Sequence, residues 1–311
     1  MKMEVIMKAI LHKKYGPPEG MYLGEIETPT IKEHELLIQI HASTVTIGDT
    51  ILRKLPRPVA WLFGVLMGSP RKIVPGHELA GVVTAVGSQI TRFKVSDAVF
   101  GTTTGRKMGA NAEYVALPES WKQGMLAHKP VKLSFAEAAA LPIGAVAALQ
   151  LLRKADIQPG QSVVVYGASG SLGSYAVQIA RVLGAEVTAI CSAGNHDWVR
   201  ELGAARTFDY HEADFATQAG EHDVVFAAVT KLSKADRQTM LKPGGTFISA
   251  MSMTNENDAD LEWLAQQAEA GLLRAHIDRR YPLTDVPTAH AYVDAGHKKG
   301  NVVIEIIPDS K

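Results

Sequence analysis

Cysteine is almost absent from this sequence of 311 residues, and Cys191 is the one example. A single cysteine excludes an internal disulfide and is typical of a cytoplasmic protein. Excess charge is absent too, because 32 Lys and Arg residues balance 32 Asp and Glu residues. This balance argues against nucleic acid or an anionic membrane as a partner. The longest apolar run, residues 138–149, is too short to span a bilayer, and no secretory signal sequence is recognisable.

The remaining composition is that of a globular protein with a sizeable core. Apolar residues make up 46% of the chain and charged residues 21%, which is ordinary for such a protein. The length suits about two domains. No internal repeat or low-complexity tract interrupts the sequence.

The stretch from Gln161 to Ala180 carries the clearest structural signal. A run of apolar and β-branched residues over 162–166 predicts a buried strand, and helical periodicity begins soon after it. Between them lies a G-x-x-G-x-x-G pattern. A strand, a glycine turn and a helix in this order gather backbone N–H groups at a helix N-terminus, which attracts an anion such as a pyrophosphate. The residues predicted to bind it are Gly167, Ala168, Ser169, Gly170, Ser171, Leu172 and Gly173.

This pattern has a plain alternative, which is a glycine-rich turn without a ligand. Glycine spacing alone is a weak signal, and the spacing here differs from the usual G-x-G-x-x-G. However, a second strand is predicted over 186–191, after a gap of helical length. This context favours a dinucleotide site.

Short strands separated by turn residues predict a compact β domain over residues 1–122. The expected strands are Met7–His12, Leu36–His41, Leu79–Val86 and Val95–Phe100. A helix is predicted after this domain over 135–155, with Ser134 and Glu137 as a capping box and an interruption near Pro142.

Strands and helices alternate from residue 162 onwards, which predicts an α/β fold with a parallel, doubly wound sheet. We assign residues 123–270 to this domain and expect residues 271–311 to return to the first domain. The predicted strands are 162–166, 186–191, 207–208, 224–229, 246–249 and, near the end of the chain, 301–307. The predicted helices after the glycine turn are 196–202, 234–241, 258–270 and 285–295.

An apolar segment bounded by prolines, residues 56–70, has two interpretations. It contains large side chains from Trp61 to Met67. One interpretation is a short piece of core. The other is a lid over a substrate pocket or a partner contact, because apolar patches on loops are typical of binding surfaces.

Eight motifs follow one another along nearly the whole chain. They are PGHELAGVVTAVGS, RFKVSDAVFG, GANAEYVALPE, FAEAAALPIGAVAALQ, VVVYGASGSLGSYAVQIARVLGA, LKPGG, IDRRYPL and GHKKGNVVIEI. In this order they resemble the zinc-free medium-chain dehydrogenase/reductases, in the quinone oxidoreductase and zeta-crystallin branch. The resemblance implies a GroES-like β domain that carries the substrate, a Rossmann domain that carries a nicotinamide cofactor, and a cleft between them.

The resemblance also bears on metal binding and catalysis. Zinc-dependent relatives use a cysteine, the histidine of a GHE motif and a later cysteine as ligands. Here the histidine is His77, but Thr46 occupies the first cysteine position and residues 141–143 the second, so we expect no metal. The predicted catalytic residues are Thr46, Asp49 and His77, with Thr46 or Ser43 relaying a proton from water. A purely structural, hydrogen-bonded histidine is the alternative for His77.

Cofactor preference depends on the end of the second Rossmann strand. NAD-preferring sites place Asp or Glu there to bind the ribose hydroxyls, whereas this strand ends without an acid, which permits NADPH. The resemblance implies a 2′-phosphate pocket of Ser or Thr, Lys and Tyr. Ser192 and Tyr210 match this pocket, with simple packing as the alternative for Tyr210. Asn195 replaces the lysine, and Lys298 and Arg200 are candidates to supply the missing cation.

The resulting hypothesis is an NADPH-dependent oxidoreductase that transfers hydride to a small-molecule quinone or α,β-unsaturated carbonyl without a metal. Such acceptors need orientation and an apolar pocket more than acid–base help. One alternative is a zinc-independent alcohol dehydrogenase or carbonyl reductase. The other is a weakly catalytic NADPH-binding protein that acts as a sensor or binds a partner.

Assembly is the last expectation that the sequence supports. Only residues 250–257 separate the last predicted Rossmann strand from the next helix, whereas the resembling proteins carry a longer segment with a further strand. We therefore expect a Rossmann sheet that lacks its last strand. The resemblance implies a homodimer that often pairs through this edge of the sheet. Without the edge strand a homodimer is still possible, but we do not expect it to form in the same way.

Overall fold

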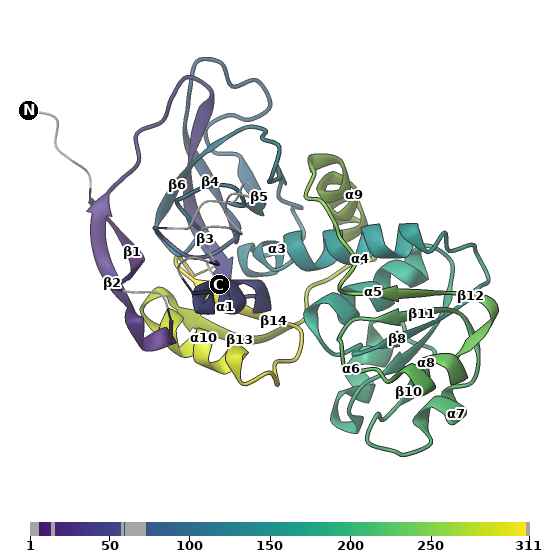
Figure 1. Cartoon of the computed structure of the whole chain (residues 1–311). Coiled ribbons are helices and arrows are strands. Elements are labelled where there is room, and N and C mark those ends of the chain that lie inside the picture. Colours follow the sequence, from purple (N-terminus) through teal and green to yellow (C-terminus); the bar gives the residue numbers. More distant parts are fainter. Residues whose placement is uncertain (1–5, 14–15, 57–58, 60–72, 309–311) are drawn as a thin grey trace, which may run out of the picture. The chain divides into compact units, whose positions relative to one another are not determined.

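The computed structural model describes residues 6–13, 16–56, 59 and 73–308, and these form two compact units (Figure 1). The β unit takes its residues from 1–143, 256–269 and 277–311. The Rossmann unit takes its residues from 144–255 and 270–276. The apolar segment from Trp61 to Met67 lies outside the described residues.

Two sheets form the frame of the β unit. In the smaller one, β1 (Ile6–His12) pairs antiparallel with β2 (Met21–Glu27). The larger one has seven strands in the order β13-β14-β3-β4-β5-β7, with β6 also paired on β3. Its strands are β3 (Glu35–Thr44), β4 (Glu78–Val86), β5 (Ala98–Thr102), β6 (Tyr114–Pro118), β7 (Leu126–His128), β13 (Ile277–Pro282) and β14 (Asn301–Glu305). The return of the chain end to this sheet agrees with the expected fold class, whereas the sequence predicts no strand at β2, β6, β7 or β13.

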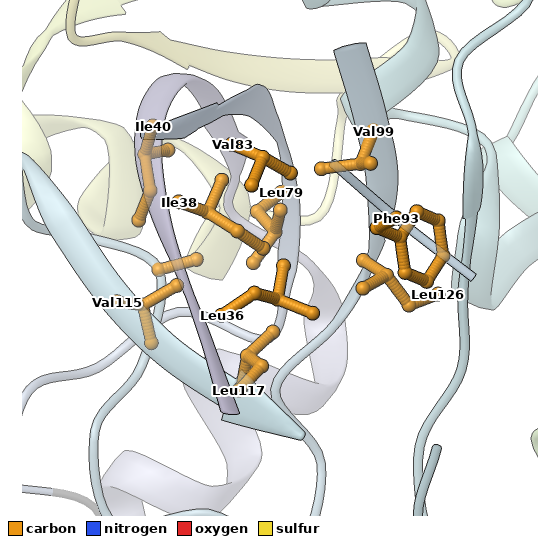
Figure 2. Packing of buried hydrophobic residues seen from close by; sticks show 11 residues of the cluster. Leu36, Ile38, Ile40, Leu79, Val83, Phe93, Val99, Val115, Leu117 and Leu126 are labelled. Atoms are coloured by element: carbon orange, nitrogen blue, oxygen red, sulfur yellow. The ribbon is translucent and has the colours of Figure 1, made fainter. Parts of the chain in front are cut away.

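Alternating side chains of β3 lie at the centre of the core of the β unit. Leu36, Ile38 and Ile40 follow the period-two pattern of a strand, and each is 0% exposed. They pack with Leu79 and Val83 of β4 (Figure 2). Full burial of one such side chain contributes about 1.5–3 kcal/mol. This packing fixes the end of β3 beside the start of β4, where the polar residues of the candidate site lie.

Among the described residues, four helices and two short 3-10 turns with given bounds complete the β unit. They are η1 (Pro18–Gly20), α1 (Ile47–Lys54), α3 (Phe135–Ala139), α9 (Asp258–Glu269), η3 (Leu283–Asp285) and α10 (Val286–Asp294). The capping box of Ser134 and Glu137 at α3 is confirmed, as is the break before Pro142, where α4 (Pro142–Lys154) begins. The sequence does not predict α1, which begins at a second capping box formed by Thr46 and Asp49.

The Rossmann unit is built on a parallel sheet with strand order β10-β9-β8-β11-β12. This arrangement confirms the predicted doubly wound fold. In the described residues the sheet ends at β12, as the short segment 250–257 leads us to expect. The elements that follow α4 are β8 (Ser162–Tyr166), α5 (Ser171–Val182), β9 (Glu186–Ile190), η2 (Ala193–Asn195), α6 (His196–Glu201), β10 (Arg206–Phe208), α7 (Phe215–Ala219), β11 (His222–Ala227), α8 (Lys234–Thr239) and β12 (Leu241–Ser249).

One local prediction in this unit is wrong. The strand predicted over 246–249 begins too late, because residues 242–245, Lys-Pro-Gly-Gly, lie within β12, which begins at Leu241. β12 meets β11 through a register shift between His222 and Val224, so the glycines are accommodated as a bulge in an edge strand. No helix in the described part of the chain is long and apolar enough to cross a membrane.

Candidate active site

The glycine turn after β8 gives each of its three glycines a different task. Gly167 has a φ of +81°, which side chains rarely adopt, and its N–H donates to Ile190 O at 2.9 Å. A Cβ on Gly173 would lie 2.2 Å from Gly167 O, so the absence of a side chain lets α5 pack against the turn. A Cβ on Gly170 would meet only Gly167 O, at 3.5 Å. The middle glycine therefore has space beside it that a side chain could enter without a clash.

That open space lies at the N-terminus of α5. Gly170 is the N-cap residue, and no side chain caps the helix there. The N–H groups of a first helical turn have no partners within the helix, and together with the helix dipole they favour an anion. The residues present thus fit the pyrophosphate of a dinucleotide. Gly167 makes a tight turn, Gly170 leaves no side chain in the path of the pyrophosphate, and Gly173 lets the helix pack closely.

The predicted 2′-phosphate residues lie at the carboxyl end of β9. The Asn195 side chain is buried, at 4% exposure of the residue, and it holds the local chain together. Its Nδ2 donates to Ser192 Oγ at 2.7 Å, and its Oδ1 accepts from Trp198 Nε1 at 3.2 Å. Tyr210 is 41% exposed and rests against the ring of His211. The structure therefore joins Ser192 and Asn195 by a hydrogen bond within the turn after β9, whereas Tyr210 follows β10 and contacts the rings of Tyr166 and His211.

An acidic residue that the sequence analysis did not predict lies at the carboxyl end of β9. Asp209 follows β10, and its Oδ2 accepts the N–H of Ala193, in the turn after β9, at 3.0 Å. Its Oδ1 accepts from the backbone N–H of His211 at 3.0 Å and contacts His211 Nδ1 at 2.7 Å. The backbone hydrogen bond from His211 and that from Ala193 outweigh desolvation and lower the pKa of Asp209. A signal was available, because β10 is the expected neighbour of β9 in a parallel sheet.

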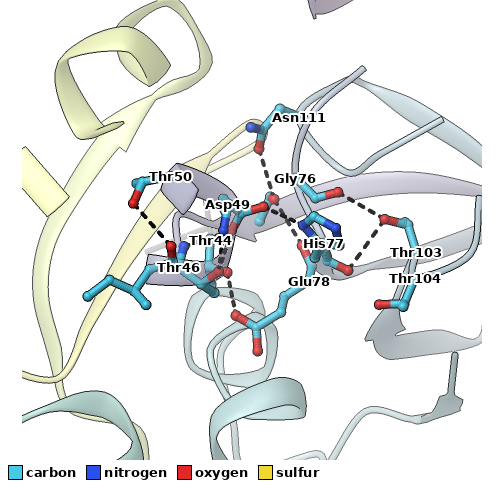
Figure 3. Close-up of polar contacts among 12 residues, drawn as sticks. Thr44, Thr46, Asp49, Thr50, Gly76, His77, Glu78, Thr103, Thr104 and Asn111 are labelled. Atoms are coloured by element: carbon cyan, nitrogen blue, oxygen red, sulfur yellow. Dashed lines mark hydrogen bonds and ion pairs between the residues drawn. The ribbon is translucent and has the colours of Figure 1, made fainter. Parts of the chain in front are cut away.

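The predicted catalytic residues form a second cluster, in the β unit (Figure 3). His77 Nδ1 lies 2.5 Å from Asp49 Oδ1. Thr46 donates to Asp49 Oδ2 through both its hydroxyl, at 2.6 Å, and its backbone N–H, at 2.8 Å. Burial alone would raise the pKa of Asp49, but the attraction and hydrogen bond of His77 and the hydrogen bond of Thr46 lower it well below its ordinary range. Asp49 is therefore ionised and can only accept, so His77 Nδ1 carries the donated proton.

The backbone on both sides of His77 is tied down. Thr103 Oγ1 donates to Gly76 O at 2.9 Å, and the Thr103 N–H donates to His77 O at 2.7 Å. Ser43, the other relay candidate, is buried, and its hydroxyl contacts Glu78 O at 2.9 Å and Asn111 Oδ1 at 3.0 Å. The backbone of His77 is fixed and its Nδ1 is held by Asp49, whereas its Nε2 has no hydrogen-bond partner within the part of the chain that the structure describes.

Glu78 is a buried carboxyl group beside this cluster that we did not count among the catalytic residues. Its Oε2 accepts from Thr44 Oγ1, and its Oε1 accepts the N–H of Ile143, at the start of α4, at 2.7 Å. Desolvation by burial raises the pKa of Glu78 to about 8, against the effect of these hydrogen bonds. The group is therefore largely protonated at neutral pH.

Lys298 lies in the β unit too, within electrostatic range of Glu78. Its Nζ donates to Gly300 O at 2.5 Å. Burial lowers the pKa of Lys298 to about 8, and attraction to Glu78 opposes the shift. Its assignment as a ligand of the 2′-phosphate stays a prediction.

Comparisons with known proteins agree with this architecture. The family profile described as "Alcohol dehydrogenase GroES-like domain" matches residues 32–129, and the profile described as "Zinc-binding dehydrogenase" matches residues 171–268 and, in a second version, 248–304. The 2-methylene-furan-3-one reductase of Solanum lycopersicum is 33% identical over 97% of this chain and 80% of its own length. The chain belongs to the medium-chain dehydrogenase/reductase family.

Two further members of the family are similar along nearly the whole chain. The NADPH-dependent alkenal/one oxidoreductase of Arabidopsis thaliana, a chloroplastic protein, is 30% identical over 97% of this chain and 80% of its own length. The solved structure of the quinone oxidoreductase from Coxiella burnetii aligns with a TM-score of 0.79 at 25% identity, over 97% of this chain and all of the other. The chain is thus a member of an oxidoreductase family, as the eight motifs predict.

Zinc ligation needs a separate test, because two of the matching family profiles are described as zinc-binding. Among the residues that the structure describes, no three His, Cys, Asp or Glu side chains are placed to hold a metal ion. His77 Nδ1 is engaged with Asp49, and Thr46 stands at the first cysteine position of the zinc-dependent members. A metal-free reaction therefore stays our prediction for this member of the family.

Proposed function

We propose that this protein is an NADPH-dependent oxidoreductase that transfers hydride to a quinone or an α,β-unsaturated carbonyl without a metal. The observation that carries the proposal is the glycine turn in a chain of this family, with Gly170 bare at the uncapped start of α5. The acceptor class is supported by the names of the relatives, which are a furanone reductase, an alkenal/one oxidoreductase and a quinone oxidoreductase. A cytoplasmic location stays a prediction from the single cysteine.

In this proposal the Rossmann unit holds the cofactor through its backbone. The N–H groups of Ser169 and of residues 171–173 bind the pyrophosphate, whereas the Gly170 N–H donates to Gly167 O at 3.1 Å within the turn. Ser192 and Tyr210 line the adenosine end. When bound, the reduced nicotinamide supplies the hydride, and little acid–base help is needed to add it to an activated carbon–carbon double bond.

The β unit supplies what remains after hydride addition, which is a proton for the enolate of the product. The His77 ring is fixed by Asp49 at Nδ1. When the ring is an imidazolium, with a proton on each nitrogen, the proton on Nε2 has a defined position, and its transfer to the enolate leaves the neutral ring with its Nδ1 proton on Asp49. Thr46 fixes the other carboxylate oxygen of Asp49. His77 thus acts as the proton donor, and Asp49 and Thr46 hold it in position. A well-placed general acid typically raises the reaction rate by about 10²–10⁴-fold.

The test follows the loss of NADPH and of NADH after addition of a panel of quinones and enones, with and without a chelator. We expect saturable turnover that the chelator leaves unchanged. His77→Asn should lower kcat by about tenfold or more at an unchanged dissociation constant for NADPH. His34→Asn, which changes an exposed histidine of the same unit, should behave as wild type. Protein that binds NADPH but reduces no member of the panel contradicts the proposed function.

A further inference from the structure

The end of β9 lacks the acid that binds ribose hydroxyls in NAD-preferring sites, yet the structure brings an acid to the same place from the next strand. Phe208 of β10 pairs in register with Ile190 of β9, so the residues after both strands leave the sheet at the same level. Asp209 is the first residue after β10. Its carboxylate reaches across to the N–H of Ala193, in the turn that follows β9.

The Asp209 carboxylate is held in this position rather than free to turn away. Ala193 N–H fixes Oδ2 at 3.0 Å, and the backbone N–H of His211 fixes Oδ1 at 3.0 Å. The side chain is 16% exposed, so it is largely but not wholly covered. A fixed carboxylate beside the adenosine ribose can accept from a 2′-hydroxyl and repels a 2′-phosphate.

The side chains near Asp209 offer little free positive charge to offset its repulsion of a 2′-phosphate. Asn195 stands where the resembling reductases have lysine, and both ends of its amide are engaged with Ser192 and Trp198. Arg200 lies near enough to lower the pKa of Cys191 against the effects of burial and Asp209, but its guanidinium is paired with Asp197 at 3.3 Å. The His211 ring contacts Asp209 itself.

We propose that Asp209 is a specificity residue that takes over, from β10, the task of the acid missing at the end of β9, so that NADH binds about as tightly as NADPH. This inference rests on the proposed function only in taking a nicotinamide dinucleotide as the ligand. It modifies the cofactor part of that proposal: NADPH still serves as a hydride donor, but the site discriminates weakly between NADPH and NADH, and Asp209 is the residue responsible.

The test uses adenosine fragments, which report on this end of the site without the acceptor reaction. Adenosine 2′,5′-bisphosphate and AMP are titrated by calorimetry, and NADPH and NADH by fluorescence, into the whole protein. For wild type we expect NADPH and NADH to differ by less than about tenfold. Asp209→Asn keeps an oxygen that can accept from Ala193, and it should tighten the 2′-phosphorylated ligands by about five- to tenfold with little change for AMP and NADH.

A second variant tests the same electrostatics without touching the hydrogen bonds of Asp209. A Cβ at Gly194 would meet nothing within 4 Å, so Gly194→Lys adds a cation to the turn at little steric cost. It should also tighten the 2′-phosphorylated ligands selectively. The matched control is Glu186→Gln, which removes an exposed charge at the opposite end of β9 and should leave all ratios unchanged.

The outcomes separate this inference from the proposed function. A wild-type preference for NADPH of about a hundredfold or more overturns it, and so does an Asp209→Asn protein that is folded and binds the fragments in the wild-type ratio. In both cases the reductase proposal stands. Failure of folded protein to bind any of the four ligands overturns the dinucleotide site itself, and the inference with it.

Discussion

The glycine turn of the Rossmann unit and the polar cluster around His77 in the β unit are built in opposite ways. The turn works because side chains are missing, so that backbone N–H groups and a close helix contact become possible. The cluster works because buried side chains satisfy one another, with Asp49 between His77 and Thr46. The turn should therefore be sensitive to any added atom, whereas the cluster should be sensitive to any lost polar atom.

Gly173→Val should give the largest effect of the predictions below. Its Cβ would meet Gly167 O at 2.2 Å, and the contact is with backbone, which cannot move aside. We expect the melting temperature to fall by about 5–10 °C and binding of NADPH to be lost. Thermal unfolding followed by circular dichroism, together with a fluorescence titration of the cofactor, measures both effects.

Gly170→Val is the matched variant three residues earlier. Its Cβ has an ordinary contact at 3.5 Å, and the backbone there, with φ −80° and ψ 170°, suits a β-branched residue. The melting temperature should stay near the wild-type value, while affinity for NADPH falls by about tenfold or more because the side chain occupies the approach of the pyrophosphate. Equal behaviour of the two variants would contradict the division of tasks between these glycines.

The contrast between the two regions also explains what the sequence could predict. β8 is predicted to the residue, and α5 is predicted in its place after the glycine turn, because their signal is local and lies in one continuous stretch. Asp209 was missed because its partner, Ala193, lies in the turn that follows another strand, and only the pairing of β9 with β10 brings the two together. Glu78 appears in the sequence as part of a motif, but its burial against Thr44 and Ile143 depends on three separate segments.

Local signals failed where the pattern was short. α1 has Thr46 as its N-cap and an acid at the third helical position, but that acid is Asp49 rather than the Glu or Gln that a capping box usually shows. Asn195 was assigned to the cofactor because its position matched a lysine of the family. The structure shows instead that a short amide at this position hydrogen-bonds its own turn through Ser192 and Trp198, which no spacing rule reveals.

The buried Glu78 carboxyl group should make the free energy of unfolding depend on pH. The pKa of Glu78 is about 8 in the folded protein and 4.5 as the reference value, so the folded state holds a proton that the unfolded chain has already lost. The stability that this proton contributes is complete below pH 4.5 and is lost as the pH rises towards 8. We expect the free energy of unfolding to fall, by on the order of 1 kcal/mol per pH unit at most.

Two other groups, His290 and Lys298, limit the pH range in which the effect of Glu78 on stability can be measured by itself. Burial lowers the pKa of His290 to about 4, so its contribution rises with pH from about 4 to 6.5 and opposes that of Glu78 there. Lys298, lowered to about 8 from 10.5, opposes it only above pH 8. Urea unfolding between pH 6.5 and 8 should therefore show a decline that Glu78→Gln abolishes, whereas Glu25→Gln, at an exposed site, keeps it. A decline that persists in Glu78→Gln would assign it to another group.

The smallest effect is expected from removing one N-cap hydroxyl, and two such variants distinguish a loss of stability from a loss of catalysis. Thr46 and Ser134 are both half-buried N-cap residues of complete capping boxes, on α1 and α3. Thr46→Ala and Ser134→Ala should each lower the free energy of unfolding by about 1 kcal/mol, since each removes one cap hydroxyl.

Only the hydroxyl of Thr46 also donates to the carboxylate that holds His77. Thr46→Ala should therefore lower kcat by a few fold and shift its pH profile, because Asp49 loses a hydrogen bond that favours its ionised form. Ser134→Ala should leave kcat unchanged at the same loss of stability. Unchanged turnover in Thr46→Ala would remove Thr46 from the proton path, and an equal loss in both variants would show that turnover follows stability rather than the position of His77.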